Sequence, residues 1–141
     1  MIVFCDTSAL VKLYIEEEGS ADLLDAVAGS SVVAVCRVAW AEAMAAFARR
    51  ARENPADDAI VDEARGRLRT HWPDFAIVEI TQTLVELAGD YADTFALRGY
   101  DSIQLAAAQT LNLAGVGAVA FACFDSRLNK AARVLGMRST G

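Results

Sequence analysis

Residues 2–14 read IVFCDTSALVKLY, and this stretch decides the fold. The apolar run over residues 2–5 is not interrupted by any polar position, which is typical of a strand buried on both faces of a parallel sheet. From Leu10 onward the apolar residues recur at helical spacing. The stretch therefore predicts a strand, a sharp turn and a helix. It places the carboxylate of Asp6 at the carboxyl end of the strand, the edge at which open α/β sheets bind ligands.

The rest of the chain repeats this alternation of strands and helices. Further strands are predicted at residues 32–36, 75–80 and 119–124, and a short fifth strand near residue 137. Helices are predicted over residues 20–29, 38–54, 55–71, 81–95, 101–113 and 125–136. Ser20 and Thr81 are the expected N-caps of the helices that begin at these two residues. Such alternation implies right-handed crossovers and a parallel sheet with helices on both faces. We therefore expect one domain over residues 1–141, a three-layer α/β/α fold with a central parallel sheet of four or five strands.

The composition suits a protein of the cytoplasm. Hydrophobic residues make up 55% of the chain, enough for a substantial core. No apolar segment approaches the roughly 20 residues needed to span a bilayer, so we expect no membrane association. The three cysteines, Cys5, Cys36 and Cys123, lie in or beside strand-like runs and show no CxxC spacing. This usage predicts reduced core residues and argues against a disulfide framework or a zinc site.

The charge balance and the histidine count narrow the classes of function. The formal net charge is −6, which argues against a protein that coats nucleic acid non-specifically. A nuclease remains compatible with this charge, because clustered acids can hold cations that meet phosphate. His71 is the only histidine. A Ser-His-Asp triad or a histidine zinc site would depend on this one residue, and neither has its other members at a usable spacing.

No residue close to Glu42 in the sequence explains the presence of its carboxylate on an apolar helix. It is the only charged residue between Arg37 and Arg49, and its neighbours at helical distances of three and four residues are apolar. No cation on the same helix can pair with it. The sequence predicts either a partner from elsewhere in the chain or a carboxylate on a narrow solvent-facing edge.

Three aspartates join Glu42 in a common pattern. Asp6 and Asp125 each follow a predicted strand and precede a predicted helix, whereas Asp101 and Glu42 lie in the first turns of predicted helices. Each aspartate alone is explained as a helix cap, and Asp101 with Gln104 fits a capping box. Strand carboxyl ends and helix N-termini share one rim of a parallel sheet, so the four acids are expected to converge. Oxygen ligands of this kind favour Mg²⁺ or Mn²⁺ and predict metal-assisted hydrolysis of a phosphodiester.

The chain resembles the PIN-domain family, and within it the VapC-type toxins of bacterial and archaeal toxin–antitoxin pairs. Four motifs carry the resemblance, in the family's order and over nearly the whole chain: FCDTSALVKLY at residues 4–14, WAE at 40–42, RGYDSIQLA at 98–106, and FDSRL at 124–128 followed by alanines at 131 and 132. Gln104 stands where many relatives carry histidine, and Ser102 where many carry alanine. Neither is a ligand in the family pattern.

The resemblance implies an Mg²⁺-dependent endoribonuclease. Its acidic quartet is matched at Asp6, Glu42, Asp101 and Asp125. By analogy Asp6 and Asp101 bind the metal, Glu42 orients or activates the water, and Asp125 holds a second metal or a water-bridged contact. Thr7 or Ser8 would support Asp6 by hydrogen bonding.

The resemblance also implies partners. The family forms homodimers, and a cognate antitoxin places its C-terminal segment in a groove near the acids, often with an arginine facing them. A heterotetramer or a larger complex with the antitoxin is expected. RNA must be held by local cations on so acidic a chain, and the cations near the motifs are Lys12, Arg37, Arg98, Arg127 and Lys130. For each of these, a solvated helix surface is the alternative interpretation.

Two other classes of function stay open from the sequence. A receiver-like signalling domain is another parallel α/β fold with clustered acids and Mg²⁺, but it needs a phosphorylatable aspartate after a middle strand. The predicted strand at residues 75–80 offers Glu79 and Thr81 instead. A PIN-like protein without catalysis, which only binds RNA or a partner, is the second alternative. The presence of all four acids argues against it.

Overall fold

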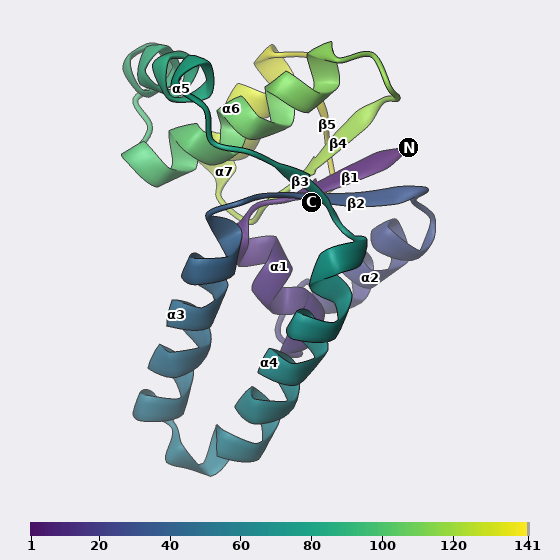
Figure 1. Ribbon diagram of the computed structural model, residues 1–141, viewed down its shortest axis with the longest axis vertical. Helices are drawn as coiled ribbons and strands as arrows, with labels where there is room; N and C mark the ends of the chain where they lie inside the picture. The colour runs from purple at the N-terminus through teal and green to yellow at the C-terminus, as the bar shows by residue number, and fades with distance from the viewer. Residues whose placement is uncertain (141) are drawn as a thin grey trace.

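A five-stranded, all-parallel sheet forms the centre of the molecule. The computed structural model describes residues 1–140. The strands are β1 (Ile2–Cys5), β2 (Val32–Cys36), β3 (Ala76–Val78), β4 (Val119–Ala122) and β5 (Arg138–Ser139), in the spatial order β3-β2-β1-β4-β5 (Figure 1). β1 is the middle strand, and Ile2 lies opposite both Val32 of β2 and Val119 of β4. The predicted α/β fold with a parallel sheet is confirmed, including the short fifth strand.

Helices cover both faces of the sheet. One side carries α1 (Thr7–Tyr14), α2 (Ser20–Ala28), α3 (Ala39–Glu53) and α4 (Asp58–His71), and the other carries α5 (Gln82–Phe95), α6 (Gly99–Leu113) and α7 (Ser126–Val134) (Figure 1). Short 3₁₀ turns at Pro55–Asp57 and Trp72–Asp74 precede and follow α4. None of the helices in the described part of the chain has the length and apolar character needed to cross a membrane.

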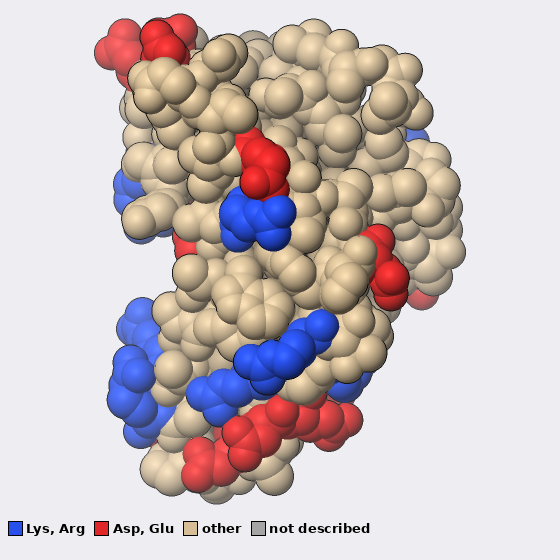
Figure 2. Space-filling model, in the orientation of Figure 1, with Lys and Arg blue, Asp and Glu red and all other residues tan. Residues whose placement is uncertain are grey.

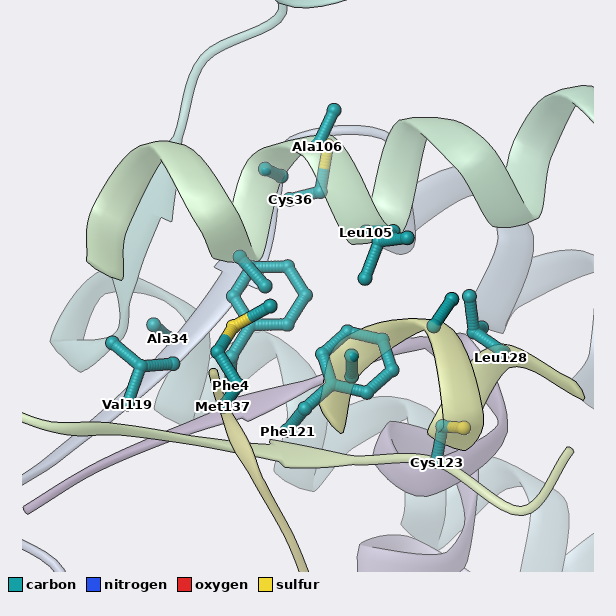
Figure 3. Close-up of a cluster of buried hydrophobic side chains, with 14 of the residues drawn as sticks. Phe4, Ala34, Cys36, Leu105, Ala106, Val119, Phe121, Cys123, Leu128 and Met137 are labelled. Atoms are coloured by element: carbon teal, nitrogen blue, oxygen red, sulfur yellow. The ribbon is translucent and has the colours of Figure 1, made fainter. Parts of the chain in front are cut away.

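The core has two layers because side chains of β1 alternate between the faces of the sheet. Ile2 and Phe4 point into a cluster beneath α6 and α7, where the Phe4 and Phe121 rings stack with centroids 5.9 Å apart (Figure 3). Val3 and Cys5 belong to the opposite cluster with α1, α3 and α4. β1 is therefore buried on both faces, as its unbroken apolar run predicted. All three cysteines are buried and unpaired, which confirms their assignment to the core.

The turn between α1 and α2 differs from the sequence prediction. Ser20 was expected to cap the helix, but the N-cap is Gly19, with a φ of 90°, and Ser20 is the first helical residue. The Ser20 hydroxyl instead accepts from the Glu17 N–H at 3.0 Å and donates to the Lys12 carbonyl at 2.9 Å. The serine thus ties the turn back to the end of α1.

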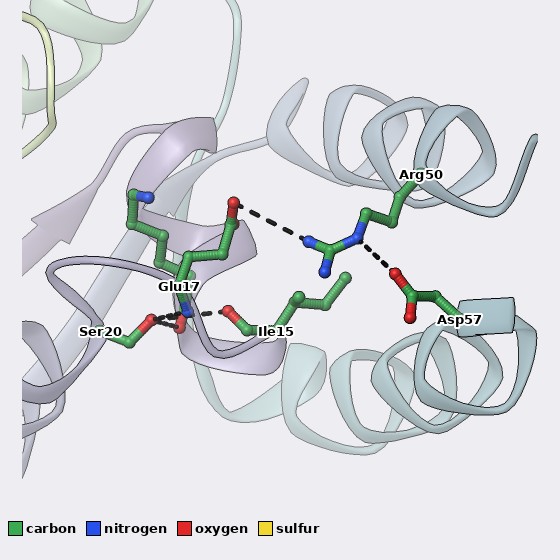
Figure 4. A network of polar contacts seen from close by, with 6 residues as sticks. Ile15, Glu17, Ser20, Arg50 and Asp57 are labelled. Atoms are coloured by element: carbon green, nitrogen blue, oxygen red, sulfur yellow. Dashed lines mark hydrogen bonds and ion pairs between the residues drawn. The ribbon is translucent and has the colours of Figure 1, made fainter. Parts of the chain in front are cut away.

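A second contact anchors the same turn from outside. The Arg50 guanidinium lies 3.0 Å from the Asp57 carboxylate and 3.9 Å from that of Glu17 (Figure 4). Arg50 therefore joins the α1–α2 turn to the connection between α3 and α4.

Other element boundaries are also corrected. The strands predicted at residues 75–80 and 119–124 are shorter than expected. The helix predicted to begin at Asp101 begins two residues earlier, at Gly99, with Arg98 as its N-cap. The predicted caps at Thr81 and Asp125 are confirmed, since their side chains accept backbone N–H groups three residues later.

Substitution of Gly19 should destabilise the fold. A Cβ at Gly19 would lie 2.5 Å from Cε1 of Phe124, and the φ of 90° disfavours L side chains. We expect Gly19→Ala to lower the free energy of unfolding by about 1–3 kcal/mol. Gly66→Ala is the matched control because it adds a methyl group to an exposed site in α4 with no heavy atom within 4 Å. It should raise stability by about 0.5–1 kcal/mol. Urea unfolding of both variants measures the difference, and equal effects would contradict this account.

Candidate active site

Asp6 occupies the carboxyl end of the central strand. Its backbone N–H donates to the Ala122 carbonyl at 3.1 Å, which continues the pairing of β1 with β4. Its carboxylate accepts from the Ala9 N–H at 2.9 Å and from the Ser8 hydroxyl at 2.7 Å. The helix-cap interpretation is therefore right for Asp6, and Ser8 supports the carboxylate. The residue is only 6% exposed, unlike an ordinary surface cap.

The surroundings of Asp6 disfavour its charge. Burial raises the pKa of its carboxyl group to about 6, although the hydrogen bonds from Ala9 and Ser8 act in the opposite direction. The negative charges of Asp101 and Glu42 raise this pKa further. Three of the four predicted acids therefore lie within electrostatic reach of one another, and a cation beside Asp6 would offset their repulsion.

Glu42 finds its partners on two other helices. The Thr7 hydroxyl on α1 donates to Glu42 Oε1 at 2.7 Å, and Gln104 Nε2 on α6 donates to the same oxygen at 2.9 Å. Gln104 Nε2 also donates to the Thr7 hydroxyl at 3.1 Å, which closes a triangle. The half-buried carboxylate is thus held by neutral donors from elsewhere in the chain. Thr7, predicted as a possible support for Asp6, instead supports Glu42.

Gln104 is the site residue that the sequence prediction missed. It is 3% exposed, and its Oε1 is buried without a hydrogen-bond partner in the described part of the chain. The expected capping box with Asp101 is wrong, because the Gln104 side chain reaches Thr7 and Glu42. A buried unpaired carbonyl costs about 1–3 kcal/mol, so its retention favours a functional reason for this side chain. Its position among apolar residues of α6 was the available signal.

Asp101 and Asp125 line one hollow of about 290 Å³. Asp101 lies in the first turn of α6 and forms an ion pair with Arg98, with Nε and Oδ2 3.3 Å apart. Asp125 caps α7 through the Leu128 N–H at 2.9 Å. The structure thus brings these two acids to one surface, whereas Asp6 and Glu42 do not line this hollow.

The donor chemistry of the four acids fits a hard divalent cation. All four offer carboxylate oxygens, and burial raises the pKa of Asp6, with a further contribution from the charges of Asp101 and Glu42. Over residues 1–140, no group of three His, Cys, Asp or Glu side chains is arranged to hold a metal ion. Mg²⁺ needs only one or two protein carboxylates because it keeps several of its waters. The assignment of the four acids as ligands stays a prediction.

Two of the predicted RNA-binding cations border the hollow between Asp101 and Asp125. Arg98 is the ion-pair partner of Asp101, and its side chain is otherwise exposed. Arg127 donates to the Ala96 carbonyl at 3.1 Å. Both residues line the hollow, so each could meet a phosphate close to the acids.

The other three predicted cations differ in their surroundings. Arg37 forms an exposed ion pair with Glu79, which occupies its guanidinium. The Lys12 ammonium lies 4.9 Å from the centre of the Phe124 ring. Lys130 lines a second hollow, beside the first.

The face shown in Figure 2 carries most of its basic side chains over the part that contains α3 and α4. Acidic side chains lie beside these basic ones, and a basic and an acidic side chain also adjoin at the centre of the face. In this part of the chain, Arg50 pairs with Asp57 and Arg65 with Asp62. We therefore expect RNA contacts to depend on a few cations near the acids.

The fold defines the chain as a parallel α/β protein with acidic side chains at the carboxyl-end edge of its sheet. Residues 3–134 match the PIN domain, so the chain belongs to the PIN-domain family. It is 32% identical over 137 residues to ribonucleases VapC45 and VapC49 of two Mycobacterium tuberculosis strains. Each match covers 97% of this chain and 93% of the relative.

Solved structures share the fold at low sequence identity. A toxin–antitoxin complex from Klebsiella pneumoniae matches with a TM-score of 0.63 and 20% identity, over 88% of this chain and 87% of the other. PAE2754 from Pyrobaculum aerophilum matches with a TM-score of 0.68 and 18% identity, over 99% and 90%. FitAcB from Neisseria gonorrhoeae matches with a TM-score of 0.64 and 13% identity, over 99% and 96%. These matches confirm the predicted PIN-like fold.

Removal of the Asp6 charge should stabilise the metal-free protein. The folded-state pKa of about 6 lies above the ordinary value of 3.8, so this carboxyl group favours the folded state most below pH 4. The contribution is lost as the pH rises through 6. Asp6→Asn keeps a capping side chain and should raise the free energy of unfolding at pH 8, by on the order of 3 kcal/mol.

Unfolding in EDTA at pH 8 and pH 4 measures this effect, and the gain should be absent at pH 4. Asp125→Asn makes the same change at an exposed cap and serves as the control. A decrease in stability of Asp6→Asn at pH 8 would contradict the argument from burial.

Proposed function

We propose that the protein is an Mg²⁺-dependent endoribonuclease, the toxin component of a toxin–antitoxin pair. The observation that carries the proposal is the buried Asp6 carboxylate, whose pKa is raised by burial and by the charges of Asp101 and Glu42. Membership of the PIN-domain family and near full-length similarity to two ribonucleases support it. The same membership argues against a receiver-like signalling domain.

The four acids take different parts in this proposal. Asp6 and Asp101 bind the cation, Mg²⁺ or alternatively Mn²⁺, and Asp125 holds a second ion or a water-bridged contact. An ion held by these residues would supply Lewis-acid stabilisation of the phosphate and would lower the pKa of a bound water. Ser8 and the Ala9 N–H fix the Asp6 carboxylate.

Glu42 is the proposed group that orients the attacking water and accepts its proton. The hydrogen bonds from Thr7 and Gln104 both end on Oε1. Oε2 is therefore the atom that we assign to the water. Because the two donors come from α1 and α6, they fix the carboxylate against rotation before substrate arrives.

The proposal includes a cognate antitoxin and a homodimer in the cytoplasm, with a heterotetramer or larger complex when the antitoxin is bound. Two structural neighbours support the antitoxin: a toxin–antitoxin complex from Klebsiella pneumoniae, and VapBC2 from Rickettsia felis bound to a DNA fragment from its promoter. An arginine of the antitoxin would suit the acidic site as a charge-paired inhibitor.

Cleavage of RNA should require both the divalent cation and the acids. We expect the purified protein to cut labelled single-stranded RNA in Mg²⁺ or Mn²⁺ and to lose this activity in EDTA. Asp101→Ala should lower the rate by at least about a hundredfold. Cleavage that persists in Asp101→Ala would indicate a contaminant. A wild-type protein that binds RNA without cutting it would favour the non-catalytic alternative.

Removal of the Gln104 hydrogen bonds should lower turnover more than substrate affinity. Gln104→Leu leaves Glu42 with one donor, and we expect kcat to fall about tenfold or more with little change in KM. Gln104→His can donate through its ring N–H and should retain most of the activity. Gln109→Leu removes another buried glutamine from α6 and is the control. Equal decreases in both leucine variants would assign Gln104 a purely structural role.

A further inference from the structure

A second hollow lies beside the acidic one. It has a volume of about 360 Å³ and is lined by Cys123, Phe124, Ser126, Asn129, Lys130 and Arg133. Ser126 lines both hollows, so they adjoin at the N-terminus of α7. The second hollow is therefore the neighbour of the one that Asp101 and Asp125 line.

The Phe124 ring in this hollow is exposed and yet held in place. It is 42% exposed, although it directly precedes the site residue Asp125. The backbone of Gly19 approaches the ring so closely that a Cβ there would lie 2.5 Å from Cε1. The Lys12 ammonium lies over the ring, 4.9 Å from its centre. A phenyl ring fixed between a glycine and a lysine, but open to solvent, offers an apolar surface with little ordering cost on binding.

The charged side chains that line the second hollow are all basic, although the chain as a whole has a net negative charge. Lys130 and Arg133 lie three residues apart on α7 and line it together. Neither forms an ion pair with an acid of the described chain. Lys12 adds a third cation at the ring itself. A polyanion with flat apolar groups is the ligand whose chemistry matches this combination.

We propose that this second hollow, formed by Phe124, Lys130 and Arg133, binds the nucleotide of single-stranded RNA that neighbours the scissile linkage. Its base stacks on the Phe124 ring, and its phosphate lies against Lys130 and Arg133. Every base has a flat face, so the subsite positions RNA with little sequence preference. The inference rests on the proposed nuclease function and specifies where its substrate is held.

A fluorescent base tests the stacking directly. Oligoribonucleotides of about eight residues, each with 2-aminopurine at one position, are titrated in Mg²⁺ with the cleavage-deficient Asp101→Asn protein. We expect fluorescence quenching at one position, its disappearance in Asp101→Asn/Phe124→Ala, and its retention in Asp101→Asn/Phe124→Tyr. The dissociation constant should rise about tenfold with Phe124→Ala, and an abasic nucleotide at the same position should have the same effect. Leu113→Ala removes another exposed apolar side chain and should change neither result.

The phosphate contact has its own measurement. Lys130→Gln combined with Arg133→Gln should reduce the salt dependence of RNA binding. The slope of the logarithm of the binding constant against the logarithm of the salt concentration should decrease in magnitude by about one to two. Each cation that no longer contacts a phosphate leaves about one counterion bound to the RNA. In the active protein, Phe124→Ala should raise KM and leave kcat nearly unchanged. Circular dichroism and the retained signal of Phe124→Tyr separate this effect from misfolding.

The outcomes distinguish the subsite from the nuclease. The subsite is wrong if the protein cleaves RNA in Mg²⁺ but the Phe124 variants leave KM and the quenching unchanged, and the Lys130/Arg133 variant leaves the salt dependence unchanged. The proposed nuclease function would remain. Stacking at Phe124 in a protein that does not cut RNA would overturn the nuclease and keep the subsite. If Phe124→Ala weakens only the binding of an antitoxin peptide, the hollow is a protein contact and the proposal is wrong.

Discussion

The burial of the Asp6 carboxylate is the constraint on which the rest of the site depends. β1 is hydrogen-bonded to a strand on each side, and the Asp6 N–H is still part of this pairing. The backbone at Asp6 is therefore held in the sheet. Two short hydrogen bonds fix it, whereas burial and the neighbouring acids oppose its charge. A rigid carboxylate with an unbalanced charge favours the binding of a cation.

The order of the strands explains how distant acids come near Asp6. β2 and β4 are the two strands paired with β1, and the segments that follow them carry Glu42 and Asp125. In a parallel sheet all three strands end at the same edge, so the segments that carry these acids leave the sheet on either side of β1. Asp101 arrives separately, in the first turn of α6. The acidic edge is therefore a result of the topology, with each acid placed by its own strand or helix.

Local sequence patterns correctly indicated that Glu42 has a distant partner, but they assigned the wrong roles to Gln104 and Thr7. The absence of a cation near Glu42 correctly indicated a partner from elsewhere, because helical neighbours are readable from spacing. The identity of that partner was not readable, since Gln104 is separated from Glu42 by 62 residues. Gln104 was assigned to a local capping box, which is the commoner use of a glutamine at that spacing. Thr7 was linked to the adjacent Asp6 for a similar reason, although its hydroxyl reaches α3.

The sequence by itself determined the alternation of strands and helices, the burial of β1 on both faces, the caps at Asp6, Thr81 and Asp125, and the set of acids at strand ends and helix starts. These features follow from periodicity and local backbone chemistry, which act over a few residues. Only the tertiary structure decided that Gln104 and Thr7 hold Glu42, that Asp101 and Asp125 share a hollow, and that Phe124 lies open between Gly19 and Lys12. These contacts join residues far apart in the chain, and their geometry is set by how the helices pack on the sheet.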